Sequence, residues 1–257
     1  MTISSPMLNG RTALITGASS GIGARLAEVF AAAGARVVLA ARRMDRTQAL
    51  ADRIGETGGQ ALAVPLDVTD EASIIAAYEA IEREFGPVDT LVANSGISAA
   101  GRSTELPRDD ITRVFDTNLM GVYLTVREGA KRMMAAGSRD SGRGRIVLIG
   151  SITAMMTGQG DAAYATSKAA VDHLGRQFAR EWVRMGINVN TVQPGYIRTE
   201  LAGDWFDTDG GAKQIAGWHR RRLMDIDALD ETVLFLASDA SRYITGATIT
   251  VDDGQAL

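Results

Sequence analysis

Apolar residues along this chain follow two alternating patterns. Short apolar runs, typical of buried strands, are separated by longer segments in which apolar residues recur every three or four positions, as on one face of a helix. After the first run, at residues 12–16, Ile22, Leu26 and Phe30 share such a face, and this helix is predicted to end at Gly34. The later runs cover residues 37–41, 60–66, 90–93, 145–150, 187–193 and 247–251.

This alternation indicates an α/β protein. The strand segments are apolar without a regular polar alternation, which is typical of parallel sheets that helices cover on both faces. Thr69 and Asp70 offer a cap for a further helix that runs to Phe85. The length of 257 residues suffices for one large domain. We therefore predict a single domain over residues 1–257 with a doubly wound Rossmann fold, a seven-stranded parallel sheet with helices on both faces.

Two segments stand apart from this alternation. Residues 136–144 are polar and rich in glycine, and we expect a solvent-facing loop there. Residues 194–217 form the longest irregular stretch and follow a predicted strand. Ligands of open α/β sheets bind beyond the carboxyl ends of the strands, and so long a loop usually has a function or local helices. We expect residues 194–217 to form a mobile substrate lid.

Composition narrows the possible functions. Hydrophobic residues make up 46% of the chain and the formal net charge is −4, which argues against a nucleic-acid-binding surface. The chain contains no cysteine, so disulfides, thiolate catalysis and cysteine metal sites are excluded. His173 and His219 lack metal-ligand spacing, and we predict no metal site.

The chain carries no sign of a membrane or export segment. No apolar stretch reaches the ~20 residues that a membrane span needs. The first ten residues lack the basic start and apolar core of a signal peptide. We expect a cytoplasmic enzyme.

The turn after the first strand is glycine-rich. Gly17, Gly21 and Gly23 lie between the strand at residues 12–16 and the helix that follows, and a second strand comes next. This order is typical of dinucleotide-binding folds, where glycines let the backbone approach a pyrophosphate and the helix N-terminus attracts its charge.

The end of the second strand indicates which dinucleotide binds. Folds that use NAD place an acidic residue there to accept hydrogen bonds from the ribose 2′-hydroxyl. This chain has Ala41, followed by Arg42 and Arg43. Guanidinium groups suit a phosphate through paired hydrogen bonds, so we interpret the pair as a preference for NADP(H), with NAD(H) possible. The alternative is that both arginines are simply solvated at the start of a helix.

A tyrosine and a lysine four residues apart supply candidate chemistry. Tyr164 and Lys168 share one face of a helix, and Ser151 precedes them. A phenol has an ordinary pKa of about 10, and a nearby ammonium favours the phenolate. Ser151 adds a hydroxyl that could hold a substrate oxygen. Such tyrosine–lysine pairs also occur on many surface helices, so the pair is informative together with the glycine turn.

Taken together, the motifs resemble the short-chain dehydrogenase/reductase family, and the chain is similar to its 3-oxoacyl-carrier-protein reductase-like members from Gly10 to Gly254. In chain order the motifs are Thr16-Gly17-Ala18-Ser19-Ser20-Gly21-Ile22-Gly23, Asp67-Val68, Ala93-Asn94-Ser95-Gly96, Asn118, Ser151, Tyr164, Lys168, and Pro194-Gly195 followed by Ile197 and Thr199.

The resemblance implies an oxidoreductase that transfers a hydride between NADP(H) and a ketone or secondary alcohol. It implies that Tyr164 is the general acid and base and that Ser151 donates a hydrogen bond to the reacting oxygen. It also implies that Lys168 lowers the Tyr164 pKa and binds the nicotinamide ribose, and that Asn118 binds a water molecule through which protons pass between Lys168 and solvent. It also implies a homotetramer or homodimer. The cofactor-binding residues would be Gly17, Ser19, Ser20, Gly21, Ile22, Gly23, Arg42, Arg43, Asp67, Val68, Asn94, Ser95, Gly96, Tyr164, Lys168, Pro194, Gly195, Ile197 and Thr199.

Three positions depart from the family pattern. Ser95 stands where alanine is usual, a small change that should preserve the turn. Asp253 stands where glycine is common, and aspartate tolerates left-handed backbone better than most residues. Ser20 stands where many NADP-using relatives have a basic residue, so the NADP prediction depends on Arg42, Arg43 and the missing acid.

Substrate identity is weakly encoded. The candidates for the pocket wall are mostly apolar and favour a hydrophobic or aromatic substrate, although each could equally be ordinary packing. Arg220, Arg221 and Arg222 could steer an acidic substrate or form a solvated face. Two other functions stay open: an NAD-dependent dehydrogenase of a catabolic alcohol or diol, and a catalytically silent dinucleotide sensor. The pocket-wall candidates are Met155, Met156, Gln159, Tyr196, Trp205, Phe206 and Trp218.

Overall fold

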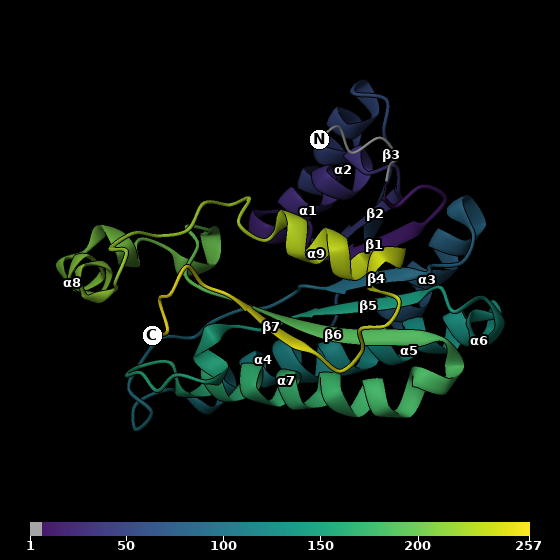
Figure 1. Ribbon diagram of the computed structural model, residues 1–257. Coiled ribbons are helices and arrows are strands. Elements are labelled where there is room, and N and C mark those ends of the chain that lie inside the picture. Colours follow the sequence, from purple (N-terminus) through teal and green to yellow (C-terminus); the bar gives the residue numbers. More distant parts are fainter. Residues whose placement is uncertain (1–6) are drawn as a thin grey trace.

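The computed structural model describes residues 7–257, and within them seven parallel strands form one sheet (Figure 1). The spatial order is β3-β2-β1-β4-β5-β6-β7, so the predicted doubly wound fold is confirmed. Residues 1–6, part of the segment on which the signal-peptide prediction depends, lie outside the described residues. The strands are β1 (Thr12–Thr16), β2 (Arg36–Ala41), β3 (Gln60–Pro65), β4 (Thr90–Ala93), β5 (Gly144–Ile149), β6 (Ile187–Pro194) and β7 (Thr248–Val251).

Helices cover both faces of this sheet (Figure 1). One apolar core packs α1, α2 and α9 against one face, and a second core packs α3, α5 and α7 against the other. None of the helices within residues 7–257 has the length and apolar character that crossing a bilayer requires. The helices are α1 (Gly21–Ala32), α2 (Met44–Glu56), α3 (Glu71–Phe85), α4 (Arg108–Phe115), α5 (Gly121–Ala135), α6 (Ser138–Ser141), α7 (Ala162–Trp182), α8 (Asp209–Gly217) and α9 (Asp230–Ala237).

Strand β1 shows why the strands lack polar alternation. Ala13 and Ile15 belong to the core beneath α1, α2 and α9, whereas Leu14 belongs to the opposite core. Because successive side chains point to opposite faces, a strand buried on both sides is mostly apolar on both faces, and a buried polar residue such as Thr16 accepts hydrogen bonds from neighbouring backbone.

The chain reverses its direction of winding beside β1. Strand β1 pairs with β2 on one side and with β4 on the other, both in parallel register. In open α/β sheets a crevice forms at this switch point, outside the carboxyl ends of the strands. The glycine turn lies at the carboxyl end of β1, so the topology alone places it beside the crevice.

The segment 136–144 differs from the predicted solvent-facing loop. It contains the short helix α6, and Ser138 at its start is buried, with its hydroxyl donating to the carbonyl of Met185 at 2.7 Å. Most of the segment faces solvent as predicted, but Ser138 does not, because a segment remote in sequence covers it.

The predicted lid contains local helices. Residues 194–217 comprise two 3₁₀ turns, η4 (Glu200–Ala202) and η5 (Trp205–Asp207), and then α8. In Figure 1, α8 lies to one side, away from the sheet. This placement suits a lid, and its mobility stays a prediction.

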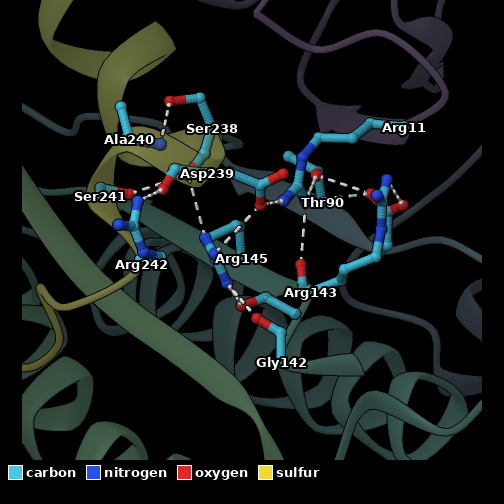
Figure 2. A network of polar contacts seen from close by, with 12 residues as sticks. Arg11, Thr90, Gly142, Arg143, Arg145, Ser238, Asp239, Ala240, Ser241 and Arg242 are labelled. Atoms are coloured by element: carbon cyan, nitrogen blue, oxygen red, sulfur yellow. Dashed lines mark hydrogen bonds and ion pairs between the residues drawn. The ribbon is translucent and has the colours of Figure 1, made fainter. Parts of the chain in front are cut away.

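Buried arginines connect the amino ends of three neighbouring strands (Figure 2). Arg11 precedes β1 and Arg145 lies in β5, and their side chains are only 1% and 2% exposed. Both guanidinium groups pair with Asp239, and Arg11 also donates to Thr90 at 3.0 Å. Burial, followed by the charge of Arg11, lowers the pKa of Arg145. This network lies at the end of the sheet opposite the crevice. Its ion pairs with Asp239 hold the 3₁₀ turn η6 (Asp239–Ser241) against the strands.

Candidate functional site

The glycine turn has no space for side chains at two of its positions. Gly17 adopts a left-handed φ of 67°. A Cβ on Gly23 would lie 2.6 Å from both the Gly17 carbonyl and Asn94 Nδ2, closer than atoms approach. Ser20 precedes α1 in an extended conformation, and among the described residues its hydroxyl does not cap the first turn. The first N–H groups of α1 can therefore serve an anion.

A cleft of about 270 Å³ opens beside this turn. It contains most of the predicted cofactor-binding residues, together with positions that the sequence reasoning did not single out. Gly23 lies outside its lining and acts by close packing instead. The lining comprises Gly17, Ser19, Ser20, Gly21, Ile22, Ala41, Arg42, Arg43, Leu66, Asp67, Val68, Asn94, Ser95, Gly96, Ile97, Thr117, Thr199, Glu200 and Leu201.

The turn after β4 is tied to β1 through its backbone. Thr16 Oγ1 accepts hydrogen bonds from the backbone N–H groups of Asn94 (3.0 Å) and Ser95 (3.1 Å). Asn94 Nδ2 donates to the Thr16 carbonyl at 2.9 Å. Because the backbone of Ser95 makes these bonds, serine in place of alanine preserves the turn, as expected.

The two arginines after β2 differ in their surroundings. Arg42 is largely exposed, with its guanidinium 4.0 Å from Asp67. Arg43 Nη2 donates to the hydroxyls of Ser19 and Ser20, both at 2.9 Å, and Nη1 pairs with Glu200 at 2.9 Å. Arg43 therefore faces the glycine turn, and the alternative of a freely solvated arginine is wrong for it.

Sequence reasoning missed Glu200 and Arg46. Glu200 comes from η4, more than 150 positions after Arg43 and Arg46, and it pairs with both. These two pairs hold the pKa of Glu200 down at about 2. No local pattern signals such a contact. The only clue in the sequence was that Glu200 follows the predicted cofactor-binding residue Thr199 directly.

Ser151, Tyr164 and Lys168 come together beyond the carboxyl end of β5. Ser151 caps the short turn η2 (Ile152–Ala154), accepting from Thr153 N at 3.2 Å. Lys168 Nζ lies 5.7 Å from the centre of the Tyr164 ring and donates to the Ile149 carbonyl at 2.8 Å. The predicted constellation is present on neighbouring elements.

Burial dominates the protonation of this group. It raises the pKa of Tyr164 to about 12, although a hydrogen bond with Ser151 acts in the opposite direction. Burial also lowers the pKa of Lys168 to about 8. The predicted lowering of the Tyr164 pKa by Lys168 is therefore not seen in this structure, where removal from water raises this pKa most and the opposing influence is Ser151.

Asn118 lies in a π-helical segment, η1 (Asp116–Met120), between α4 and α5. Its amide accepts from Ile97 N at 2.8 Å and donates to Ile97 O at 2.9 Å and to Ser167 Oγ at 3.0 Å. A Cβ on Gly96 would lie 3.4 Å from both Asn118 Oδ1 and Lys168 Nζ. Asn118 thus joins the turn after β4 to α7, next to Lys168.

Of the predicted residues at the end of β6 and after it, only Thr199 lines the cleft, together with its neighbours Glu200 and Leu201. Thr199 lines it opposite Gly21. Pro194 ends β6, and a Cβ on Gly195 would lie 2.4 Å from Gln255 Oε1. Ile197 is buried and bridges to Met224. Pro194, Gly195 and Ile197 therefore shape the path of the chain and do not line the cleft.

Three of the pocket-wall candidates pack together. Tyr196 stacks on Trp218 with ring centres 5.2 Å apart and meets the edge of Phe206 at 5.7 Å. The Tyr196 phenol also raises the pKa of Tyr164, so this cluster adjoins the proton-transfer group. Met155, Gln159 and Trp205 are exposed and Met156 is half-buried, and none of the seven candidates belongs to the lining of the cleft.

The basic run is paired with an aspartate, and both histidines lie outside the lining of the cleft. Arg220 and Arg222 pair with Asp253 at 3.1 and 2.8 Å. Asp253 has the expected left-handed backbone, with φ 53°. His173 contacts Gln177, and within residues 7–257 no cluster of three or more His, Asp or Glu side chains could hold a metal ion.

Comparisons with known proteins agree with this geometry. The family model described as short chain dehydrogenase matches residues 11–210. The 3-oxoacyl-[acyl-carrier-protein] reductase FabG of Escherichia coli is 38% identical over 245 residues, covering 95% of this chain and 97% of the relative. D-threitol dehydrogenase of Mycolicibacterium smegmatis is 34% identical over 250 residues, covering 97% and 94%.

Solved structures show the same architecture. A gluconate 5-dehydrogenase from Burkholderia cenocepacia J2315 in complex with NADP and tartrate superposes with a TM-score of 0.92 at 33% identity, covering 99% of this chain and 98% of that one. A short-chain type dehydrogenase/reductase from Mycobacterium marinum has a TM-score of 0.92 at 37% identity, covering 99% of both chains.

Proposed function

Since this chain belongs to the short-chain dehydrogenase family and is an oxidoreductase of that family, we propose that it uses NADP(H) to transfer a hydride between the nicotinamide and a ketone or secondary alcohol. One observation carries the proposal. Gly96 lines the cleft, and a Cβ on it would lie 3.4 Å from Lys168 Nζ. The cleft therefore extends from the phosphate-binding turn to Gly96, beside Lys168, while Ser151, Tyr164 and Lys168 themselves lie outside its lining.

The residues present fit a dinucleotide. The close approach of Gly23 to Gly17 leaves bare backbone where a pyrophosphate would bind. Arg43 would hold a 2′-phosphate and Asp67 the adenine ring, and Asn94–Gly96 would line the nicotinamide half. When bound, the cofactor supplies or accepts the hydride.

The side chains of this protein move the proton. Because its pKa is raised, Tyr164 holds its proton at neutral pH and can give it to the carbonyl oxygen during reduction. Ser151 would donate a hydrogen bond to the same oxygen. With a pKa of about 8, Lys168 is still mostly an ammonium at pH 7 and would stabilise the phenolate that Tyr164 leaves behind. Asn118 would position Lys168 and the turn after β4.

The choice of NADP(H) over NAD(H) is supported by Arg43 at the turn and by the absence of an acid at position 41. The Burkholderia cenocepacia relative in complex with NADP is consistent with it. The alternative, an NAD-dependent dehydrogenase of an alcohol or diol, is favoured by one observation: Glu200 already occupies Arg43 and Arg46. A silent sensor is disfavoured because Tyr164 and Lys168 are both present and adjacent.

Turnover by Tyr164→Phe tests the proposal. This variant keeps the ring and deletes the proton, so it should lose activity with a panel of ketones and alcohols while its affinity for NADPH stays within about twofold of wild type. Initial rates with NADPH, NADH, NADP and NAD separate the two cofactor hypotheses. Substantial turnover by the variant would refute the role of Tyr164.

Assembly, location and the lid complete the proposal. Exposed Met120 and Tyr123 near the start of α5, and Val183 after α7, support a homotetramer or homodimer, which light scattering would measure. A cytoplasmic location stays a prediction from the sequence. Residues 194–217 would act as the substrate lid, with Tyr196, Phe206 and Trp218 facing an apolar substrate.

A further inference from the structure

A carboxylate of the lid segment lies among the cationic groups of the cleft. Glu200 lines the cleft beside Thr199, and its two oxygens divide between two arginines. One is Arg43, at 2.9 Å, and the other is Arg46 in the first turn of α2. With its pKa at about 2, the carboxylate is ionised at every physiological pH.

Each of the three nitrogens of Arg43 donates at least one hydrogen bond in this arrangement. Nε and Nη2 donate to Ser19 Oγ, Nη2 also donates to Ser20 Oγ, and Nη1 donates to Glu200. A guanidinium binds carboxylate and phosphate with the same planar pair of donors. A phosphate monoester that approaches this arginine therefore meets Glu200 at Nη1, together with the repulsion of its negative charge.

We infer that Glu200 is a specificity-determining residue, an internal anion that occupies the arginine pair and that a cofactor 2′-phosphate has to displace. This inference rests on the proposed use of NADP(H). Glu200 weakens binding of the phosphorylated dinucleotide relative to what Arg43 and Arg46 would provide alone. It leaves the non-phosphorylated dinucleotide almost unaffected, because that ligand does not need Arg43 Nη1.

The same competition couples cofactor choice to the lid. Glu200 opens η4, whose turn is closed by the bonds Ala202 N–Thr199 O (3.1 Å) and Gly203 N–Glu200 O (3.2 Å). While Glu200 holds Arg43 and Arg46, the start of the lid is fastened to α2. A 2′-phosphate releases this fastening, whereas a 2′-hydroxyl leaves it in place.

Binding of two small probes, measured by calorimetry, tests the inference without turnover. The probes are 2′,5′-ADP, which carries the 2′-phosphate, and 5′-AMP, which lacks it. In Glu200→Gln the affinity for 2′,5′-ADP should rise about fivefold at low salt, and that for 5′-AMP should change less than about twofold. The gain should shrink by at least about half when Arg43 is also replaced by alanine.

Glu28→Gln is the matched control. Glu28 also lies between two arginines, Arg25 (4.0 Å) and Arg53 (3.4 Å), but it is outside the lining of the cleft. Its replacement removes the same charge and should leave the affinity for both probes within about twofold of wild type. An equal gain in this control would assign the effect to overall charge and overturn the inference.

Hydrogen exchange tests the coupling. Amide exchange at residues 202 and 203 should accelerate when 2′,5′-ADP binds to wild type but not when 5′-AMP binds. Unchanged exchange with both probes would overturn the coupling to the lid.

The inference and the proposed function can fail separately. If wild type prefers 2′,5′-ADP strongly and Glu200→Gln changes nothing, the role of Glu200 is overturned and the use of NADP(H) stands. If wild type shows no preference and the variant acquires one, the role of Glu200 stands and the natural cofactor is NAD(H). If neither protein prefers the phosphorylated probe, both conclusions are overturned.

Discussion

Replacing Lys168 with methionine should make the folded protein more stable at pH 7 while removing its activity. Lys168 is only 3% exposed, and within the described residues the one hydrogen bond of its Nζ goes to the Ile149 carbonyl. Burial lowers its pKa from 10.5 to about 8, which means that folding the charged form costs free energy. Methionine fills similar volume without the charge.

The magnitude follows from the two pKa values. The pKa of Lys168 is 10.5 in the unfolded chain and about 8 in the folded protein, and each pH unit of this difference corresponds to about 1.4 kcal/mol. The buried lysine therefore lowers the free energy of unfolding by about 3 kcal/mol at any pH at which it is protonated in both the folded and the unfolded state. The variant also loses the bond to Ile149, worth about 1 kcal/mol. At pH 7 we therefore expect Lys168→Met to raise the free energy of unfolding by about 2 kcal/mol.

The stability of the wild-type protein changes with pH in the direction opposite to that expected for a lysine that gains an acidic partner on folding. Between pH 8 and 10.5 the unfolded chain binds more protons at Lys168 than the folded protein, so wild-type stability rises with pH in this window. The advantage of the variant should therefore disappear as pH rises towards 10.5. Titration of Tyr164, raised to about 12, affects both proteins at higher pH.

Urea unfolding of both proteins at pH 7 and pH 10 measures this difference. The difference in unfolding free energy should fall by about 2 to 3 kcal/mol between the two pH values. A difference that stays constant with pH would show that Lys168 is not buried as a charge, and the reasoning would be refuted. A variant less stable than wild type at pH 7 would refute it as well.

Three further predictions concern the cleft, the arginine network and the reaction. Gly23→Ala should weaken 5′-AMP binding by about tenfold or more and lower the free energy of unfolding by about 1–3 kcal/mol, because the new Cβ would lie 2.6 Å from the Gly17 carbonyl. Gly55→Ala is the control for both measurements, because the space around its Cβ is open. Asp239→Ala should lower the free energy of unfolding, measured with urea, by about 2 kcal/mol, because it leaves buried Arg11 and Arg145 without their shared carboxylate. The control Asp207→Ala removes an equally exposed carboxylate that pairs with the exposed Arg198, and it should lower this free energy by less than about 0.5 kcal/mol. Equal losses in the two variants would contradict the role of burial. The rate of ketone reduction should be steady below pH 8 and fall above it as Lys168 loses its proton, and a pH–rate profile that still rises at pH 9 would be inconsistent with this role.

The strands and their order of appearance were predictable because their signal is local. A strand buried on both faces is mostly apolar without regular alternation, and a glycine turn between strand and helix has a characteristic sequence. The burial of Ser138 and the contacts of the Asn118 amide were not predictable, because each depends on a partner far along the chain, Met185 for the first and Ile97 for the second.

The sequence by itself determined the fold class, the seven strands and the identity of the glycine turn, Ser151, Tyr164 and Lys168. These features depend on residue types and on spacings of a few positions, and both can be read from the amino-acid sequence. The tertiary structure decided how strongly burial shifts the pKa values of Tyr164 and Lys168, and that Glu200 meets Arg43 and Arg46. Both are matters of distance and solvent access between segments remote in the chain, and charges separated by more than 150 positions interact only after folding brings them together.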